Sequence, residues 1–218
     1  MSTKFKHIIF DFDGTIADTV PVCVDAFRLT VEPILGRPLT LDDVRSYFGP
    51  TEEGVFQKHF PDRQEELCEE YFRRYSELQR NVPETAPGIM ELIRDVKNEG
   101  VRVALVTAKG QKSCRISLDF YGIANEFEEI RVGGAEGRIK DVSIRDVLSK
   151  MGIAPENSIY VGDAVKDVVS AHKAGVPCWS AAWFASANPE KILENNPEKI
   201  FYSVAEMRRE LEKEGVLK

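Results

Sequence analysis

The stretch that decides the fold is "HIIFDFDGTIADT", residues 7–19. Its first four residues are mostly apolar and predict a short buried strand. Three aspartates, Asp11, Asp13 and Asp18, follow the strand at once. A carboxylate that is removed from water is costly unless it is paired, hydrogen-bonded or bound to a metal. The aspartates after this strand therefore need cations or hydrogen-bond donors supplied by other parts of the chain.

The composition indicates an ordered protein of modest size. The chain has 218 residues, of which 43% are hydrophobic and 30% charged. This length suits one large domain, or one domain with a modest insertion. The net charge of −7 argues against a broad nucleic-acid surface. A small anionic substrate is compatible with this net charge, because a binding site can be locally positive in a protein that is negative as a whole.

Targeting and cysteine signals point to the cytoplasm. The basic N-terminus leads into a mostly apolar run of only four residues, 7–10, which is too short for a signal peptide. No segment approaches the roughly 20 apolar residues that span a membrane. We expect a cytoplasmic monomer or homodimer without membrane or nucleic-acid partners. The four cysteines are far apart in sequence and are expected to be reduced thiols: Cys23, Cys68, Cys114 and Cys178.

The periodicity divides the chain into two parts. Residues 18–83 show helical spacing throughout, including an amphipathic stretch at 61–80. From residue 84 onward, apolar strands alternate with helices, which is typical of βαβ units and a parallel sheet. We therefore predict an α/β fold: a Rossmann-like parallel sheet core with helices on both faces, formed by 1–17 and 84–218, and an inserted all-helical cap domain at 18–83.

Polar residues follow three of the predicted strands. Asp11 and Asp13 follow the first, Thr107 ends the strand at 101–107, and Asp163 ends the strand at 158–163. Sites in open parallel sheets form beyond the carboxyl ends of the strands. We expect these residues to meet at one edge, together with Asp167 from the next helix. Such a group of carboxylates repels itself unless a hard cation such as Mg²⁺ binds it.

Four motifs in this order resemble those of a known family. They are "DFDGT" at 11–15, Thr107 in "VALVTAK", Lys140 in "GRIKDVSIRDVL" and "GDAVKD" at 162–167. Together they resemble the haloacid dehalogenase superfamily, in particular its helical-cap phosphatases of the phosphoglycolate phosphatase type. The joint occurrence of the first and last motifs is specific, whereas a lone Thr or Lys is a weak signal.

The resemblance implies a phosphatase mechanism. Asp11 would be the nucleophile that forms an aspartyl-phosphate, and Asp13 the general acid and base. Thr107 and Lys140 would hold phosphoryl oxygens. Gly14, Thr15 and Ala108 would line the phosphoryl pocket, with Gly14 allowing a sharp turn. The implied cofactor is Mg²⁺, and its ligands would be Asp11, Asp13 (through its backbone carbonyl), Asp163 and Asp167.

The third motif has alternatives. The family usually has Pro after the motif lysine, but Asp141 follows Lys140 here. Lys109, Lys112 and Lys166 lie near other motifs and are alternative bases. Lys140 is preferred because it begins the helix that leads to the strand ending in aspartate. Asp18 is interpreted as a helix N-cap rather than a ligand.

The family contains several reactions. Asp13 argues against a dehalogenase, because halide leaves without a proton. We expect an Mg²⁺-dependent phosphatase that acts on a small phosphorylated metabolite, a phosphoglycolate-like phosphomonoester. A sugar phosphomutase, a phosphonate hydrolase with Lys58 as its cap lysine, and a pyrophosphatase are alternatives on the same scaffold. A non-catalytic phospho-ligand-binding protein is disfavoured, since Asp11 and Asp13 are both present.

The cap is expected to choose the substrate. In this cap type a loop between helices reaches the site, and "RSYFGPTEEG" at 45–54 has the corresponding position. Gly49 and Pro50 mark a turn within it. We expect Arg45 to face the substrate and to bind a second anionic group on it.

Overall fold

The fold is built on one parallel sheet. The computed structural model describes residues 4–82, 84–137, 140–195 and 197–218. Six strands lie in the order β3-β2-β1-β4-β5-β6, so the first strand is central. The α/β prediction is confirmed. The strands are β1 His7–Phe10, β2 Arg102–Val106, β3 Glu129–Arg131, β4 Ser158–Gly162, β5 Cys178–Ala181 and β6 Lys199–Phe201.

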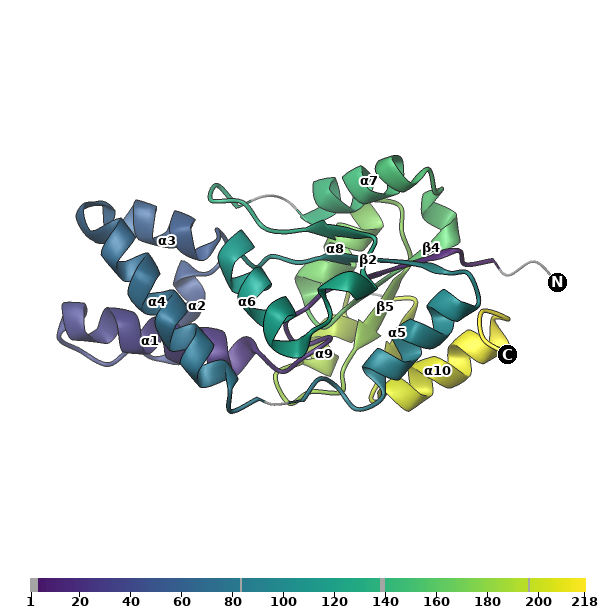
Figure 1. The fold of residues 1–218 in the computed structure, drawn as a ribbon, viewed down its shortest axis with the longest axis horizontal. Helices are drawn as coiled ribbons and strands as arrows, with labels where there is room; N and C mark the ends of the chain where they lie inside the picture. The colour runs from purple at the N-terminus through teal and green to yellow at the C-terminus, as the bar shows by residue number, and fades with distance from the viewer. Residues whose placement is uncertain (1–3, 83, 138–139, 196) are drawn as a thin grey trace.

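Helices cover both faces of the sheet (Figure 1). Alternate residues of a strand point to opposite faces, so Ile8 and Phe10 join one buried cluster and Ile9 joins the other. The first cluster packs against α5 Ile89–Asn98, α6 Gln111–Tyr121 and α10 Val204–Lys213; the second packs against α7 Lys140–Met151, α8 Val165–Lys173 and α9 Pro189–Leu193. Short 3₁₀ turns occur at Pro61–Arg63, Ala124–Glu126 and Pro155–Asn157.

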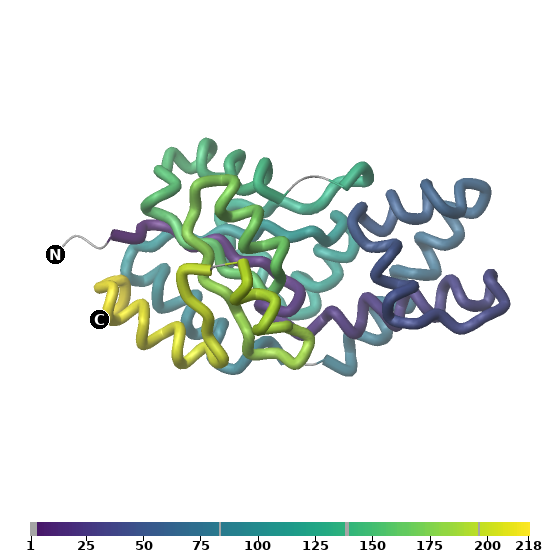
Figure 2. Tube along the Cα trace, turned by 180° about the vertical axis from the view of Figure 1, so that it is seen from behind, coloured from purple at the N-terminus to yellow at the C-terminus, as the bar shows by residue number. Residues whose placement is uncertain are grey.

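Four helices between β1 and α5 form a separate unit at one end of the molecule, opposite the two termini (Figure 2). Their apolar faces share a buried cluster of their own, rich in aromatic rings. The second of these helices begins with a capping box, in which the Asp43 N–H donates to the Thr40 hydroxyl and the Thr40 N–H donates to the Asp43 carboxylate. The helices are α1 Val20–Leu35, α2 Leu41–Tyr47, α3 Glu52–His59 and α4 Gln64–Gln79. We call this unit the cap and the remainder the core.

Two chain segments join the cap to the core. They lie side by side, since the Ala86 N–H donates to the Ile16 carbonyl at 2.7 Å. The boundaries at 17/18 and 83/84 stay predictions, and residue 83 is outside the described residues. The interpretation of Asp18 as an N-cap is wrong: Thr19 is the N-cap of α1, and the Asp18 carboxylate accepts a bond from the Ser186 hydroxyl.

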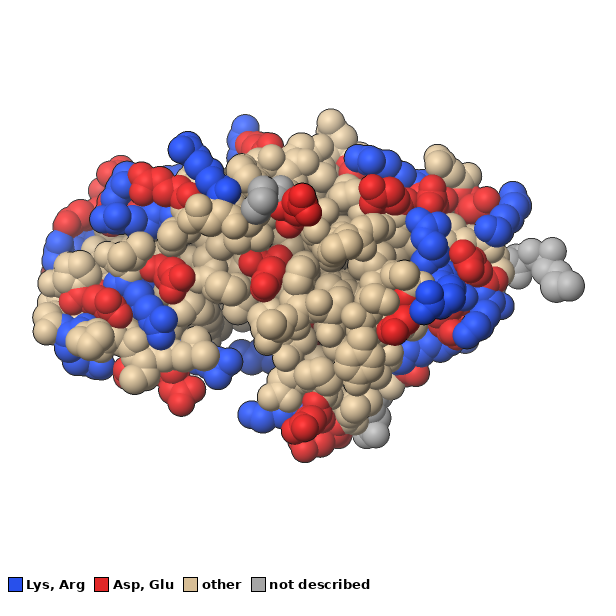
Figure 3. All heavy atoms as spheres, turned by 90° about the horizontal axis from the view of Figure 1, so that it is seen from below, with Lys and Arg blue, Asp and Glu red and all other residues tan. Residues whose placement is uncertain are grey.

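The surface carries both signs of charge. On the face in Figure 3, basic and acidic side chains are interspersed at the two ends, with a mostly uncharged stretch between them. This pattern differs from the continuous basic stripe of nucleic-acid-binding proteins. Among the described residues, no helix is long and apolar enough to cross a membrane.

Candidate active site

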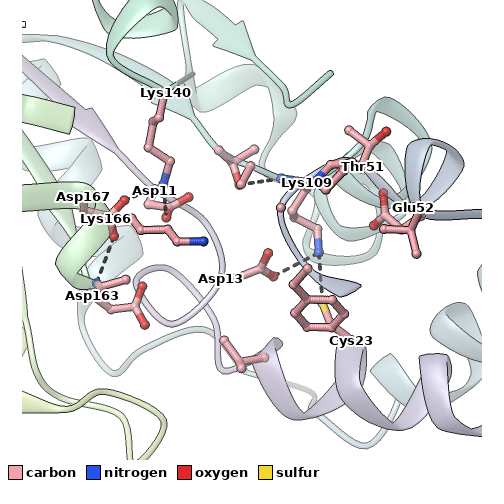
Figure 4. Close-up of a pocket in the computed structure, with 18 of the residues that line it drawn as sticks. Asp11, Asp13, Cys23, Thr51, Glu52, Lys109, Lys140, Asp163, Lys166 and Asp167 are labelled. Carbon is pink, nitrogen blue, oxygen red and sulfur yellow. Dashed lines mark hydrogen bonds and ion pairs between the residues drawn. The ribbon is translucent and has the colours of Figure 1, made fainter. Parts of the chain in front are cut away.

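The site lies where the strand order reverses, beyond the ends of β1 and β4. This switch point is where open α/β sheets bind ligands. A cavity of about 630 Å³ opens there between core and cap. Asp11, Asp13 and Thr107 line it from the core, and Thr51 and Glu52 line it from the cap (Figure 4). The fold therefore places the predicted catalytic residues and the cap loop around one cavity.

Three carboxylates form a cluster that suits a divalent cation. One oxygen each of Asp11, Asp163 and Asp167 lies within 4.8 Å of the others. Hard oxygen donors of this kind are what Mg²⁺ prefers. Asp167 is almost fully buried, and it accepts a hydrogen bond of 2.9 Å from the Ala164 N–H, which fixes its orientation. The donor set therefore fits the expected Mg²⁺.

The pKa values in the cluster show that its charge is poorly compensated. Burial raises the pKa of Asp11 to about 6, although Lys140 opposes the shift. Burial, with the nearby charges of Asp167 and Asp11, raises the pKa of Asp163 to about 9. Both directions follow from desolvation and like-charge repulsion. A cation bound between these groups would stabilise their ionised forms.

Lys140 lies against this cluster. Its Nζ is 2.6 Å from Asp11 Oδ2 and also donates to Asp167 Oδ1. Burial opposes the charge of Lys140, but the two carboxylates outweigh it and raise the lysine's pKa well above its ordinary value. Of the alternative lysines, Lys112 lies over the Phe72 ring. Among the described residues, Lys140 is the lysine that pairs with Asp11.

Asp13 has a different environment, which the sequence did not predict. Its Oδ1 accepts a hydrogen bond of 2.9 Å from Lys109 Nζ and another from the Thr19 hydroxyl. The Lys109 side chain is only 1% exposed, and its Nζ also donates to the Tyr75 hydroxyl of α4. Lys109 was considered only as an alternative base. The structure instead places it between Asp13 and the cap.

Of the other residues expected at the phosphoryl pocket, Thr107 and Ala108 line the cavity, whereas Gly14 and Thr15 lie next to Asp13 outside the lining. Gly14 has φ +71°, and a Cβ built there would be 2.1 Å from Asp163 Oδ2, so glycine is required. The Thr15 hydroxyl is buried without a hydrogen-bond partner among the described residues. Thr107 is buried, and its hydroxyl accepts from the Lys109 N–H at 3.3 Å. Ala108 lines the cavity beside it.

Arg45 is not brought to the site. It does not line the cavity, its side chain is 64% exposed, and its Nη1 pairs with Asp42 at 3.6 Å on the same helix. We expected Arg45 to face the substrate, but α2 directs its side chain to solvent. The part of the loop that does reach the cavity is residues 48–52.

A cap carboxylate at the site was also not predicted. Glu52 Oε2 accepts a hydrogen bond of 3.1 Å from the Gly110 N–H at the start of α6. Burial raises the pKa of Glu52. Glu52 is the first residue of α3, where acidic residues are common. Because an acidic residue is common at this position for local reasons, the sequence did not indicate that Glu52 contacts the core.

The family is decided by comparison with known proteins. Residues 8–181 match the family described as haloacid dehalogenase-like hydrolase. The chain belongs to this family. The predicted resemblance, fold and hydrolase class are thereby confirmed.

Individual relatives of this haloacid dehalogenase-like hydrolase are distant. A candidate pyrophosphatase, PpaX, from Caldanaerobacter subterraneus subsp. tengcongensis is 28% identical over 214 residues, covering 94% of this chain and 92% of the relative. The structure of mutant CbbY from Rhodobacter sphaeroides with xylulose-(1,5)bisphosphate is 22% identical, with a TM-score of 0.77 over 93% of this chain and 96% of that one. A predicted phosphoglycolate phosphatase from Haemophilus somnus 129PT is also 22% identical, with a TM-score of 0.77 over 96% and 99%. At these identities the two solved structures are evidence for the fold of this hydrolase and not for its substrate.

Proposed function

We propose that the protein is an Mg²⁺-dependent phosphatase that hydrolyses a small phosphomonoester through an aspartyl-phosphate. The observation that carries the proposal is the contrast between Asp11 and Asp13. Two residues apart, they have separate lysine partners, Lys140 and Lys109 respectively. Asp11 belongs to the cation-binding cluster, whereas the Asp13 side chain lies toward the cap (Figure 4). Such a division supports one nucleophile and one proton-transfer group.

In the first step Asp11 attacks phosphorus. A carboxylate oxygen of Asp11 forms a bond to phosphorus while the bond from phosphorus to the leaving oxygen breaks. The Phe12 N–H donates to Asp11 Oδ1 at 2.7 Å and orients the carboxylate. Lys140 holds its other oxygen and offers a fixed positive charge to the phosphoryl group. Asp13, protonated, gives its proton to the leaving oxygen.

In the second step water releases the phosphate. Asp13 is now ionised and takes a proton from a water molecule, whose oxygen attacks phosphorus and restores Asp11. Thr107 lies at the cavity wall where its hydroxyl can donate to a phosphoryl oxygen. Mg²⁺, when bound by Asp11, Asp163, Asp167 and the Asp13 carbonyl, would neutralise phosphoryl charge.

Other reactions of the scaffold are less well supported. A phosphonate hydrolase would need its cap lysine at the site, but Lys58 is exposed and does not line the cavity. A phosphomutase would use the same carboxylates, so that reaction is tested as well. The name of the PpaX relative keeps pyrophosphate under test as well.

The decisive experiment is a panel of phosphorylated metabolites, assayed for phosphate release with Mg²⁺. The panel includes a phosphoglycolate-type ester, sugar phosphates and pyrophosphate. Release by wild type, and its loss in Asp11→Asn and in excess chelator, would support the proposal. Isomerised sugar phosphate without phosphate release would indicate a mutase, and full activity of Asp11→Asn would exclude Asp11 as the nucleophile.

A further inference from the structure

The cap side of the cavity differs in chemistry from the core side. Five apolar residues form what we call the cap wall: Val20, Phe27, Phe48, Val55 and Phe56. Its aromatic rings pack together: the ring centroid of Phe27 is 6.1 Å from that of Phe48 and 6.0 Å from that of Phe56. Phe27, Val55 and Phe56 are at most 3% exposed and support the wall from behind, whereas Phe48, 38% exposed, presents apolar surface to whatever occupies the cavity.

Positive charge is missing from the cap side. Residues 18–82, all of which the structure describes, contain eight Lys and Arg residues, and none of them lines the cavity. Most are paired with acidic neighbours on the cap surface, as Arg45 is with Asp42 and Arg37 with Asp43. The one charged cap residue in the lining is Glu52, a carboxylate. A second anionic group on a substrate would therefore meet apolar rings and an acid.

The lysines in the lining all come from the core. Lys140 contacts Asp11 and Asp167, and Lys109 contacts Asp13. Lys166 lies on α8 beside the carboxylate cluster, at the phosphoryl end of the cavity (Figure 4). Among the described lining residues the cations thus belong to the core, and each is close to an aspartate there, whereas the cap side, where the leaving group has to lie, offers apolar residues and the Glu52 carboxylate.

We infer that the substrate is a phosphomonoester whose leaving group is uncharged and apolar, such as an alkyl or aryl alcohol of about five to eight carbons. The inference rests on the proposed phosphatase function and narrows its substrate class. An apolar group gains free energy when it leaves water for the cap wall. A carboxylate or a second phosphate placed there would lose its hydration without gaining a cation from the described cap residues. The cap wall, rather than Arg45, then determines specificity.

A matched pair of substrates tests this inference without any mutation. Pentyl phosphate and 4-carboxybutyl phosphate have the same chain and similar alcohol leaving groups, but the second carries a carboxylate at its far end. We expect kcat/KM to be at least about 30-fold higher for pentyl phosphate, mainly through KM. Phenethyl phosphate should resemble pentyl phosphate, which extends the class from alkyl to aryl groups.

Two variants connect the preference to named residues. Phe48→Arg places a cation on the cap wall and should raise kcat/KM for the carboxylated ester relative to pentyl phosphate by about tenfold or more. Glu52→Gln removes the cap carboxylate and should shift the ratio in the same direction, by a smaller factor. The matched control is Phe120→Arg, because Phe120 is similarly exposed at 42% but lies outside the cavity lining. Its ratio should equal that of wild type.

The outcomes separate the two proposals. Equal or better hydrolysis of the carboxylated ester by wild type would overturn the inference while leaving the phosphatase function in place. Hydrolysis of neither ester, of phosphoglycolate nor of 4-nitrophenyl phosphate would overturn the phosphatase function, and the inference with it. If Phe48→Arg has the far-ultraviolet circular dichroism of wild type but the same ratio of kcat/KM between the two esters, the cap wall is not the cause of the preference.

Discussion

Lys109 of the core and Tyr75 of the cap are joined by a hydrogen bond of 2.8 Å that is shielded from solvent. The same Nζ holds Asp13, so the proposed acid and base is tied to the cap helix α4 through one ammonium group. The Tyr75 hydroxyl also contacts the Ser117 hydroxyl of α6 at 2.8 Å. The position of the cap and the position of Asp13 are therefore linked by buried polar contacts.

Removing the ammonium should weaken both links. Lys109→Met leaves Asp13 and Tyr75 without their shared donor, and we expect the free energy of unfolding to fall by about 2–3 kcal/mol. Turnover should fall as well, by about tenfold or more, because Asp13 is no longer positioned. Urea unfolding and steady-state kinetics measure the two effects. Tyr75→Phe is the control: it keeps the Lys109–Asp13 pair and should cost only about 1 kcal/mol. Equal losses in both variants would contradict a special role for the ammonium.

Metal binding should depend on Asp163. Wild type is expected to unfold at a higher temperature as Mg²⁺ is added, because the ion binds the folded carboxylate cluster. In Asp163→Asn this rise should require about tenfold more Mg²⁺ or disappear. Thermal unfolding over a range of Mg²⁺ concentrations is the measurement. Asp18→Asn removes a nearby carboxylate that bonds Ser186 instead of the cluster, and it should respond like wild type. A wild-type response in Asp163→Asn would count against this metal site.

Gly14 should be irreplaceable because of Asp163. Gly14→Ala puts a Cβ 2.1 Å from Asp163 Oδ2, at a φ of +71°. We expect a loss of turnover of about 100-fold, since a displacement of this size disturbs the carboxylate cluster that is proposed to bind the cation. Gly36→Ala is a matched control, with φ +64° and nothing within 4 Å of its added Cβ. It should cost about 1 kcal/mol in stability and leave kcat at the wild-type value. Similar kcat values for the two variants would show that the clash is relieved.

His7 should make the protein less stable in acid. Burial, together with the charge of Arg102, lowers the pKa of His7 from 6.5 to about 4. Between these values the unfolded chain binds a proton that the folded chain does not, so stability falls as pH decreases through 6.5 toward 4. From pH 7.5 to 5.5 the histidine contribution amounts to about 1 kcal/mol. His7→Leu removes the titrating group, and the difference between its unfolding free energy and that of wild type should change by this amount. A difference that is constant with pH would refute the assignment.

The sheet and the carboxylate cluster were predictable because both depend on local rules. Apolar strands that alternate with helices specify a parallel sheet, and its strand ends necessarily share one edge. Asp11, Asp163 and Asp167 were therefore placed together correctly. Lys140 could be ranked above its alternatives because it begins the helix that leads to the strand ending at Asp163.

Contacts between the cap and the core were not predictable in the same way. Lys109 and Tyr75 are 34 residues apart, and Glu52 and Gly110 are 58 apart. No periodicity indicates how the cap sits on the sheet, because that orientation depends on side-chain packing between two separately folded surfaces. Arg45 illustrates the difficulty. It is next in sequence to the loop that lines the cavity, but this does not determine the direction in which α2 points its side chain.

The central position of β1 also affects how the chain folds as it is synthesised. This strand emerges first, but its neighbours are β2 and β4, and its partner Ser158 is 151 residues further along. The whole cap is translated before either neighbour exists. The cap helices pack mainly on one another within residues 20–79 and can fold before β2 is made, whereas Ile8, Ile9 and Phe10 stay exposed until both neighbouring strands exist. The nascent chain thus passes through a stage in which the cap is folded and β1 is unpaired, and at that stage a chaperone that binds apolar segments would have most to bind.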